Sequence, residues 1–428
     1  MFNIKYNIVN LVKVLLSVLN MVLMLRVFNF SQESDLYLLA YSIIYTFNFI
    51  PLLFIGQFIQ FYNDLKAKST ASAHDFYNQS IVFTALLGIG LFGLSYIFLQ
   101  SLLHLHTLSI DVERFVLLTR LMRIMVFCVL FLPLLALSER IFTAEKQFFM
   151  FYICQIIMVL LPVLSLGYML LTHQANIILL AESYTVSVVL AVVLGLGTVA
   201  VRTIPFRFSW PSSSLIPFIK NSFSTHSGIA MTNCFMPIIL NNFLVHFPNG
   251  IISCFYYSRN ALEATHTVTT DYSIRLFLAE VSAHIAQNNL SRITPLIKKY
   301  LLYVPVCFAI ISLCLYAAIP LGLKIVFMHM NLAVDVSLFK TLFLYLIPWF
   351  VLSLVSHPYY AVNLSAKNSR SIIAANLFFV LTLWGTLYFC YKNIYYIAWA
   401  LFLAQGAYFL ICLFFYVRWR KQCRPKSV

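Results

Sequence analysis

The chain consists of long apolar stretches separated by short polar connections. Each apolar stretch has about 20 or more residues, which is enough to cross a hydrocarbon layer of roughly 30 Å as a helix. The apolar runs are continuous, whereas the strands of a membrane barrel alternate apolar and polar residues, so a barrel is excluded. The pattern predicts about twelve transmembrane helices, at residues 8–30, 36–62, 80–103, 115–138, 147–171, 177–201, 215–245, 251–285, 296–320, 336–362, 371–391 and 394–417.

The connections predict a division into two halves. The most polar one, VRTIPFRFSWPSSSLIPFIK at residues 201–220, contains prolines and serines that would interrupt a continuous helix. We therefore predict an N-terminal lobe of helices 1–6 (residues 1–203), a cytoplasmic linker (204–214), and a C-terminal lobe of helices 7–12 with a basic tail (215–428). Two six-helix halves with a substrate path at their interface are a common transporter plan.

The composition agrees with this class. Of the 428 residues, 62% are hydrophobic and only 10% are charged, and the mean hydropathy is +0.89, which excludes a soluble globular protein. We predict an all-α polytopic membrane protein. The first apolar run is longer than the apolar region of a signal peptide and lacks a small-residue cleavage site, so we expect it to remain as helix 1.

The basic residues indicate the orientation. The chain has 28 Lys and Arg against 13 Asp and Glu. With a cytoplasmic N-terminus, eighteen of the basic residues fall in inside segments and five in outside segments, as the positive-inside rule requires. Both termini are thus predicted to be cytoplasmic, and no nucleic-acid partner is expected. The tail RWRKQCRPK at residues 418–426 is most simply a stop signal that contacts membrane lipids; specific recognition of a phosphoinositide-like headgroup is the alternative.

No metal or cofactor site is indicated. The nine cysteines and ten histidines show no metal-ligand spacing, and the cysteines lie mostly in apolar stretches, where they pack as small core residues. We expect no cofactor, no metal and no catalytic residue. Coupling to a monovalent cation or to the membrane potential is left open.

Two predicted helices carry polar stripes. In helix 1, Asn10, Lys13, Ser17 and Asn20 lie within an arc of about 80° at 100° per residue. Such a stripe faces either a wet cavity or a packed neighbouring helix, and Lys13 favours the cavity. Helix 7 has a similar stripe, in which small residues would also permit tight helix contact; its members are Asn221, Ser224, Thr225, Gly228 and Thr232.

Helix 8 concentrates ionisable residues. Arg259 and Glu263, and likewise Asp271 and Arg275, form opposite-charge pairs at the i,i+4 spacing. A charge at the centre of the bilayer costs about 2.5–3.5 kcal/mol on insertion scales, so it requires a partner, a wet cavity or an interface. The segment is predicted to face water or an anionic ligand; mutual neutralisation inside a dry bundle is the alternative.

Three further charges have different interpretations. Arg123 in helix 4 is placed deeply enough to reach a cavity, whereas snorkelling to the interface explains Arg114. Asp35 ends the sequence SQESD, which is typical of an N-cap before helix 2, but it also fits a coupling or positioning role.

Four stretches resemble one family of membrane proteins. They are LRVFNFSQESDLYLLAYSI (25–43), IGQFIQ (55–60), LLTRLMRIMVF (117–127) and FYYSRNALE (255–263). The first resembles the end of helix 1 and the start of helix 2 in the MurJ/MviN lipid II flippases, with Arg26, Phe28, Asp35 and Tyr37 at the matching positions. The last resembles the Tyr-Tyr-x-x-Arg-x-x-Glu segment of that family.

The resemblance implies membership of the multidrug/oligosaccharidyl-lipid/polysaccharide (MOP) exporter superfamily. It implies two six-helix lobes around a cationic V-shaped cavity and alternating access in the bacterial inner membrane. The chain also departs from the family. The arginine of helix 8 aligns with Asn260, one residue from Arg259, and the arginines of helices 1 and 2 fall near Val14, Asn20 and residues 48–50, none of them basic. The two extra C-terminal helices are absent, which matches the length of Wzx-type O-antigen flippases.

We therefore expect a flippase for a polyprenyl-diphosphate-linked saccharide, such as a peptidoglycan precursor or an O-antigen unit. The residues expected to contact the diphosphate are Lys13, Arg26, Arg123 and Arg259. The residues expected to act in coupling or positioning are Asp35, Glu263 and Asp271. The alternative is a MATE-like drug/cation antiporter, which needs embedded carboxylates. An enzyme is not expected, because no loop is large enough to hold an active site, and no particular oligomeric state is indicated.

Overall fold

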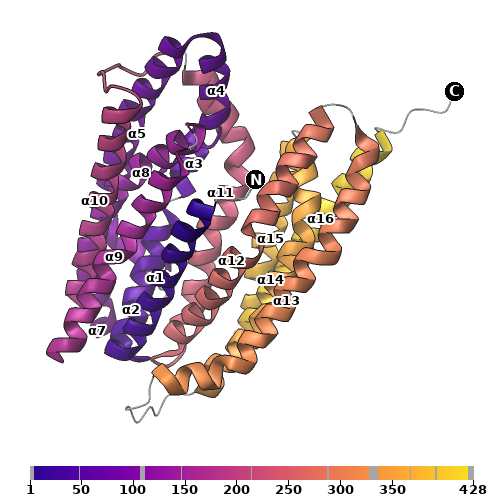
Figure 1. Ribbon diagram of the computed structural model, residues 1–428. Helices are drawn as coiled ribbons and strands as arrows, with labels where there is room; N and C mark the ends of the chain where they lie inside the picture. Colours follow the sequence, from indigo (N-terminus) through magenta and orange to yellow (C-terminus); the bar gives the residue numbers. More distant parts are fainter. Residues whose placement is uncertain are drawn as a thin grey trace. The chain divides into compact units, whose positions relative to one another are not determined.

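The computed structural model describes residues 4–47, 49–106, 111–145, 147–213, 215–286, 289–326, 336–366, 368–390 and 393–422. These residues form helices and connections without a strand, which confirms the predicted all-α class (Figure 1). The helices are α1 (Ile4–Phe28), α2 (Gln32–Thr46), α3 (Phe49–Ile55), α4 (Phe58–Lys68), α5 (Thr70–Ile97), α6 (Leu99–His106), α7 (Val112–Met125), α8 (Phe127–Ala144), α9 (Phe148–Thr172), α10 (Ile177–Arg202), α11 (Leu215–Leu244), α12 (Ile251–Ala286), α13 (Ile293–Val326), α14 (Val336–Ser365), α15 (Ser369–Cys390) and α16 (Tyr395–Gln422), with a short 3-10 turn at Leu290–Arg292.

Each of the twelve predicted segments is mainly helical over its described residues, and ten described helical segments are both long and apolar enough to cross a membrane. The chain is a multi-pass membrane protein. α11 and α12, with 30 and 36 residues, are long enough to span but are not among those ten. The predicted second span is divided into α2, α3 and α4, and Pro51 accounts for the first break because its ring clashes with the carbonyl of Phe47 in a continuous helix.

The chain divides into two compact units. Unit 1 comprises the chain up to His226 together with Pro248–Ser253, and unit 2 comprises Ser227–Phe247 and the chain from Cys254 onward. The boundaries therefore lie within α11 and near the start of α12, not in the predicted linker. The V-shaped cavity between two lobes stays a prediction.

The predicted linker is folded onto unit 1 by side chains of α5. Asn78 Nδ2 donates to the carbonyl of Pro205 at 3.5 Å, and its Oδ1 accepts from the backbone N–H of Arg207 at 3.3 Å. Gln79 Oε1 accepts from both the backbone N–H and the hydroxyl of Ser212, at 3.2 and 2.8 Å. These bonds satisfy backbone groups that have no helical partner, so the segment belongs structurally to unit 1.

An aromatic core holds this end of unit 1 together. Phe58 of α4 stacks on Phe76 of α5 with ring centroids 5.4 Å apart, and Phe76 meets Phe218 of α11 edge-on at 5.2 Å. All three rings are buried. Offset and edge-on ring pairs add about 0.5–1.5 kcal/mol beyond the burial of their area, so this cluster fixes the mutual positions of the three helices.

An ion pair joins two predicted cytoplasmic segments beside this core. Lys66 Nζ lies 2.7 Å from both carboxylate oxygens of Glu145, and the hydroxyl of Tyr62 donates to Glu145 Oε1 at 2.5 Å. Burial of Glu145 acts to raise its pKa, but the hydrogen bonds from Lys66 and Tyr62 and the charge of Lys66 together lower the pKa of this carboxyl below 4.5.

This lowered pKa predicts an acid-sensitive contribution to stability. The contribution is complete above the unfolded-state pKa of about 4.5 and is lost as the pH falls through the lower folded-state pKa. We expect the melting temperature of the purified protein to fall more steeply between about pH 6 and pH 3 than that of Glu145→Gln. The exposed neighbour Asp64, replaced by Asn, should leave the wild-type slope unchanged. Parallel curves for the wild type and Glu145→Gln would contradict this prediction.

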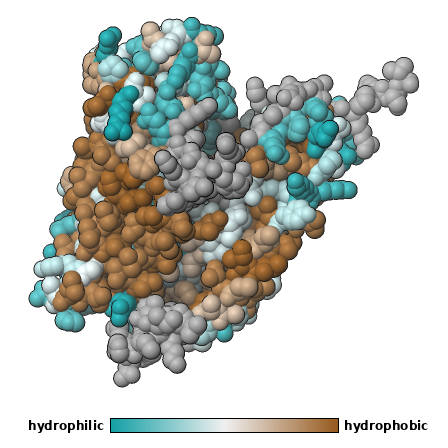
Figure 2. Space-filling view, in the orientation of Figure 1, coloured by the Kyte–Doolittle hydropathy of each residue, from teal (hydrophilic) through white to brown (hydrophobic). Residues whose placement is uncertain are grey.

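Unit 2 gathers its predicted cytoplasmic ends at one pole. A buried cluster includes Phe277 of α12, Ile297 of α13, Val362 of α14 and Tyr416 of α16, and partly buried Trp419 packs against it. The end of α12, the start of α13 and the ends of α14 and α16 therefore meet there. Figure 2 shows hydrophobic residues over the middle of each unit and hydrophilic residues near the end where α16 runs toward the C-terminus.

A candidate binding pocket within unit 2

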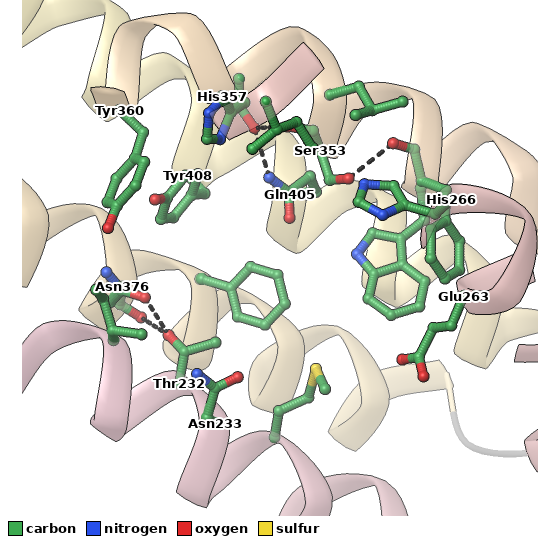
Figure 3. Close-up of a pocket in the computed structure, with 18 of the residues that line it drawn as sticks. Thr232, Asn233, Glu263, His266, Ser353, His357, Tyr360, Asn376, Gln405 and Tyr408 are labelled. Carbon is green, nitrogen blue, oxygen red and sulfur yellow. Dashed lines mark hydrogen bonds between the residues drawn. The ribbon is translucent and has the colours of Figure 1, made fainter. Parts of the chain in front are cut away.

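Unit 2 contains a pocket of about 500 Å³ inside its helices. Five helices contribute to its wall: α11, α12, α14, α15 and α16. Figure 3 shows ten labelled residues around this space, most of them polar. The lining residues are Ile229, Thr232, Asn233, Met236, Arg259, Glu263, His266, Ile274, Trp349, Phe350, Ser353, Leu354, Ser356, His357, Tyr360, Asn376, Phe379, Gln405 and Tyr408.

One wall forms where α11 packs closely on α15. A Cβ atom on Gly228 would lie 3.0 Å from the carbonyl oxygen of Ile372, so only glycine allows the two backbones to approach this closely. One turn further along α11, Thr232 Oγ1 donates to Asn376 Oδ1 at 2.7 Å (Figure 3). The polar stripe of helix 7 thus combines both readings, with tight helix contact at Gly228 and a pocket wall at Thr232.

A chain of uncharged hydrogen bonds forms the opposite wall. Gln405 Nε2 of α16 donates to Ser356 Oγ of α14 at 2.8 Å, and this hydroxyl donates to the carbonyl of Ser353 at 2.8 Å. Gln405 and Ser356 are buried. Because buried polar groups need partners, this chain holds α16 against α14 and sets the orientation of the amide. The pocket wall is therefore preorganised.

The charged edge of the pocket is the ion pair of α12. Arg259 Nη2 and Nε lie 2.7 and 2.8 Å from Glu263 Oε1, so the predicted i,i+4 pair is present. The Arg259 side chain is 16% exposed and that of Glu263 is 45% exposed. The pair lines a pocket, and its two charges also neutralise each other. The two alternatives for this segment, a surface facing water or a ligand and mutual neutralisation of charge, are therefore not exclusive. A carboxylate held this way fixes the direction of the guanidinium.

Two histidines lie among aromatic rings in and beside the pocket. The ring of His266 lies 6.2 Å from that of Phe350, and the ring of His357 lies 6.0 Å from that of Tyr360 and 5.9 Å from that of Tyr300. His357 Nε2 is buried and has no hydrogen-bond partner among the described residues. Because buried polar atoms normally have a partner, this nitrogen is a polar group of the pocket wall whose hydrogen bond is still to be satisfied.

Sequence reasoning missed several lining residues. His357, Asn376 and Gln405 were not predicted as site residues, although each interrupts a predicted span. A polar residue within an apolar span was the available signal, because such residues face the bundle interior. Without knowledge of which helices adjoin, this signal does not assign them to one pocket.

Lys13 and Arg26 lie in unit 1 at different depths of α1. The charge of Lys13 interacts with Glu139 of α8, whose Oε1 accepts from Gln155 Nε2 at 2.9 Å. Glu139 was not among the predicted site residues. Arg26 is half-buried in the last turn of α1, 13 residues further on, which is roughly 20 Å along the helix axis. The two cations therefore lie at well-separated points along the axis of α1.

The remaining cations of unit 1 lie on α7. Arg123 is exposed in its last turn. The interpretation of Arg114 as snorkelling is wrong, because this residue is buried and its charge interacts with Asp35. The side chains of Asn10, Thr225, Asp271 and Arg275 lie outside the described part of the structure, so the predicted coupling role of Asp271 stays a prediction.

Asp35 is not the N-cap of its own helix. That position is taken by Ser31, which forms a reciprocal capping box with Ser34. Asp35 is fully buried and accepts hydrogen bonds from the backbone N–H of Gly250 at 2.6 Å, from that of Ser253 at 2.7 Å, and from the hydroxyl of Ser253. These groups form the N-terminus of α12, whose N–H groups lack partners within the helix. Asp35 therefore caps α12 from α2.

Among the described residues, no group of three His, Cys, Asp or Glu is placed to hold a metal ion.

The fold is shared with solved transporters. Over 96% of this chain and 87% of the other, it is similar to a lipid II flippase MurJ in an inward closed conformation, with 16% identity and a TM-score of 0.72. It is also similar to an inward-facing multidrug resistance MATE family transporter of the MOP superfamily, with 13% identity over 99% of this chain and 100% of the other and a TM-score of 0.74. The chain has the MOP superfamily fold. The predicted resemblance is thus confirmed at the level of the fold.

A third MOP-fold structure shows how the site varies. It is a MOP superfamily transporter from Pyrococcus furiosus, 13% identical over 99% of this chain and 95% of the other with a TM-score of 0.69, and it is described as having a binding pocket of reverse polarity that suggests a different function. No family profile and no curated protein matches the sequence. Because proteins with one fold can differ in function, the shared fold does not specify what this chain binds.

Proposed function

We propose that this chain is a MOP-type transporter that moves a polyprenyl-diphosphate-linked saccharide across the bacterial inner membrane by alternating access. The observation that carries the proposal is a preorganised polar pocket, with an ion pair at its edge, inside a bundle of membrane-spanning helices. Polar and ionisable groups are costly at such a position and mark a substrate or ion path. The proposal includes no catalytic step.

The wall of the pocket suits a sugar. Its uncharged amides and hydroxyls, among them Asn233, Asn376 and Gln405, offer both donors and acceptors, as sugar hydroxyls do. Trp349 and Phe379 add aromatic surface against which the C–H faces of a sugar ring can pack. A pocket of about 500 Å³ is within the usual range of ligand sites, which is roughly 300–1,000 Å³.

The charge of the chain supports an anionic headgroup. The formal net charge is +15, and Lys13, Arg26 and Arg123 are further basic residues in membrane-spanning or adjacent helices. Guanidinium and ammonium groups bind phosphate oxygens through charge-assisted hydrogen bonds. In this proposal Arg259 contacts the cargo, and Glu263 holds the guanidinium in place.

A MATE-like drug/cation antiporter is the second candidate. It is favoured by one observation, the 45% exposure of the Glu263 side chain, because an accessible carboxylate in a pocket can bind a cation. In either mechanism, coupling to a monovalent cation or to the membrane potential would supply the driving force. The excess of basic over acidic residues makes a cationic drug the less favourable cargo.

The two candidates are separated by transport in proteoliposomes that contain the purified full chain. A polyprenyl-diphosphate saccharide with a fluorescent label should become accessible to a membrane-impermeant quencher at least about tenfold faster than in protein-free liposomes, which corresponds to a barrier lower by about 1.4 kcal/mol. A second set of vesicles, with an inward or outward Na⁺ or proton gradient, measures accumulation of a cationic dye. Dye transport without saccharide transport would reject the flippase function and support the antiporter function. Transport of neither probe would reject both functions.

A further inference from the structure

A second pocket lies at the pole of unit 2 where α14, α15 and α16 meet. Its volume is about 360 Å³. The α14–α15 connection and the first turn of α15 contribute Asn368 and Arg370, and the last turns of α16 contribute Phe415, Arg418, Trp419 and Gln422. It is separate from the first pocket, with which it shares no lining residue.

The charged side chains that line this second pocket are all basic. Residues 336–428 include nine Lys and Arg but no Asp or Glu. Both Arg370 and Arg418 are exposed, and neither forms an ion pair with a described residue. The pocket therefore has two guanidinium groups and no carboxylate from its own helices, in contrast to the neutralised pair of Arg259 and Glu263.

The N-terminus of α15 adds to the positive potential of this pocket. α15 begins at Ser369, between the lining residues Asn368 and Arg370, and Asn368 Oδ1 accepts from the backbone N–H of Ser371 at 3.4 Å. The N-terminus of a long helix carries partial positive charge and unpaired N–H groups, which favour an anion. Arg370 is the second residue of α15, so its charge adds to that of the terminus.

The position of the pocket relative to the membrane is indicated by α16. Its apolar run ends at Arg418, and Trp419 is partly buried against the buried cluster of Phe277, Ile297, Val362 and Tyr416. Tryptophan and arginine at the end of a spanning helix lie at the depth of lipid headgroups. An apolar residue, Phe415, lies one turn deeper in the same pocket.

We propose that this pocket binds the phosphate group of an anionic phospholipid between Arg370 and Arg418. Arginine fits this role because its planar guanidinium binds phosphate oxygens in pairs, and two of them surround one phosphate. The Asn368 and Gln422 amides can bind the polar part of the headgroup, while Phe415 contacts the start of an acyl chain. Basic pockets between helices on the cytoplasmic side are known to recognise such headgroups.

The test uses the purified full chain in detergent and native mass spectrometry with added phosphatidylglycerol or phosphatidylcholine. The wild type should retain phosphatidylglycerol in preference to phosphatidylcholine. The double variant Arg370→Gln with Arg418→Gln should bind phosphatidylglycerol about tenfold or more weakly, because it loses the paired guanidinium contacts. Arg370→Lys with Arg418→Lys, which keeps the charge but not the planar fork, should fall between the two.

A matched control distinguishes a specific lipid site from nonspecific electrostatic attraction to basic residues. Arg202→Gln with Arg207→Gln removes the same charge from two exposed arginines of unit 1 and should leave the affinity within about twofold. An equal loss in both double variants would overturn the proposal. A final experiment adds inorganic phosphate at millimolar concentration as a competitor. Displacement of the lipid at that concentration would show a free-phosphate site instead of a lipid site. The melting temperature of each variant shows that it is folded.

Discussion

Replacing Asp35 by alanine is expected to lower the free energy of unfolding by about 3–5 kcal/mol, since it removes one partner of a buried, hydrogen-bonded charge. The change leaves the backbone N–H groups of Gly250 and Ser253 without their acceptor. It also removes the carboxylate with which the charge of buried Arg114 interacts. The melting temperature of the purified protein and its recovery after membrane extraction measure this effect.

Three variants define the origin of this loss. Asp35→Asn keeps one acceptor oxygen but presents an NH₂ group to a second donor, so its stability should lie between those of the wild type and the alanine variant. Ser253→Ala removes the hydroxyl that is hydrogen-bonded to Asp35 and to Ser34 Oγ, and should cost about 1–2 kcal/mol. Glu33→Ala removes an exposed carboxylate from the same helix and should have no measurable effect. If Asp35→Ala melts at the same temperature as Glu33→Ala, Asp35 does not cap α12.

Replacing Arg259 by alanine is expected to slow saccharide transport at least about tenfold, which corresponds to about 1.4 kcal/mol of lost interaction with the cargo. The reason is that, among the described side chains, Arg259 supplies the only guanidinium in the wall of the first pocket, and Glu263 holds it there. The effect on stability should be small, because the pair is partly exposed and screened by water. Initial rates in proteoliposomes, normalised to the amount of folded protein, provide the measurement.

The partner residue distinguishes the two candidate functions. Glu263→Gln keeps the size of the side chain and removes its charge, so a flippase should retain most of its saccharide transport, with the guanidinium less firmly oriented. In an antiporter the same variant should abolish cation-coupled dye accumulation, because the carboxylate is then the ion-binding group. Asn260→Ala, at the exposed position next to Arg259, should match the wild type in both assays. A loss in Asn260→Ala equal to that in Arg259→Ala would indicate general damage to α12.

The first pocket shows how charge and packing act together in unit 2. α12 carries an ion pair at the pocket edge, while α11, α14, α15 and α16 supply uncharged groups that are already hydrogen-bonded to one another. Such a wall needs little reorganisation when a polar ligand enters, and preorganisation lowers the cost of binding. The close contact at Gly228 depends on the absence of a side chain, so a larger residue there would displace α11 from α15.

Predictions from sequence were most successful where the cause is local. Continuous apolar runs of sufficient length become helices in a membrane because each backbone polar group must be satisfied within its own segment. The pair of Arg259 and Glu263 follows from helical spacing alone, since residues four apart share a face. The break after α2 was not predicted, although Pro51 gives it a local cause.

Predictions were incomplete where the cause is a contact between distant segments. Asp35 has the sequence context of a cap for its own helix, yet it caps α12, more than 200 residues away. The burial of Arg114 likewise depends on contacts between distant segments. The same is true of the assembly of His357, Asn376 and Gln405 into one pocket.

The sequence by itself determined that this is an all-α membrane protein, roughly where its apolar segments lie, and that one helix carries an internal ion pair. Only the tertiary structure decided which helix ends meet, which polar groups surround a pocket, and which arginines remain without a carboxylate. The physical reason is that helical periodicity specifies the face on which a side chain lies, whereas the partner of that face depends on close packing between segments far apart in the chain.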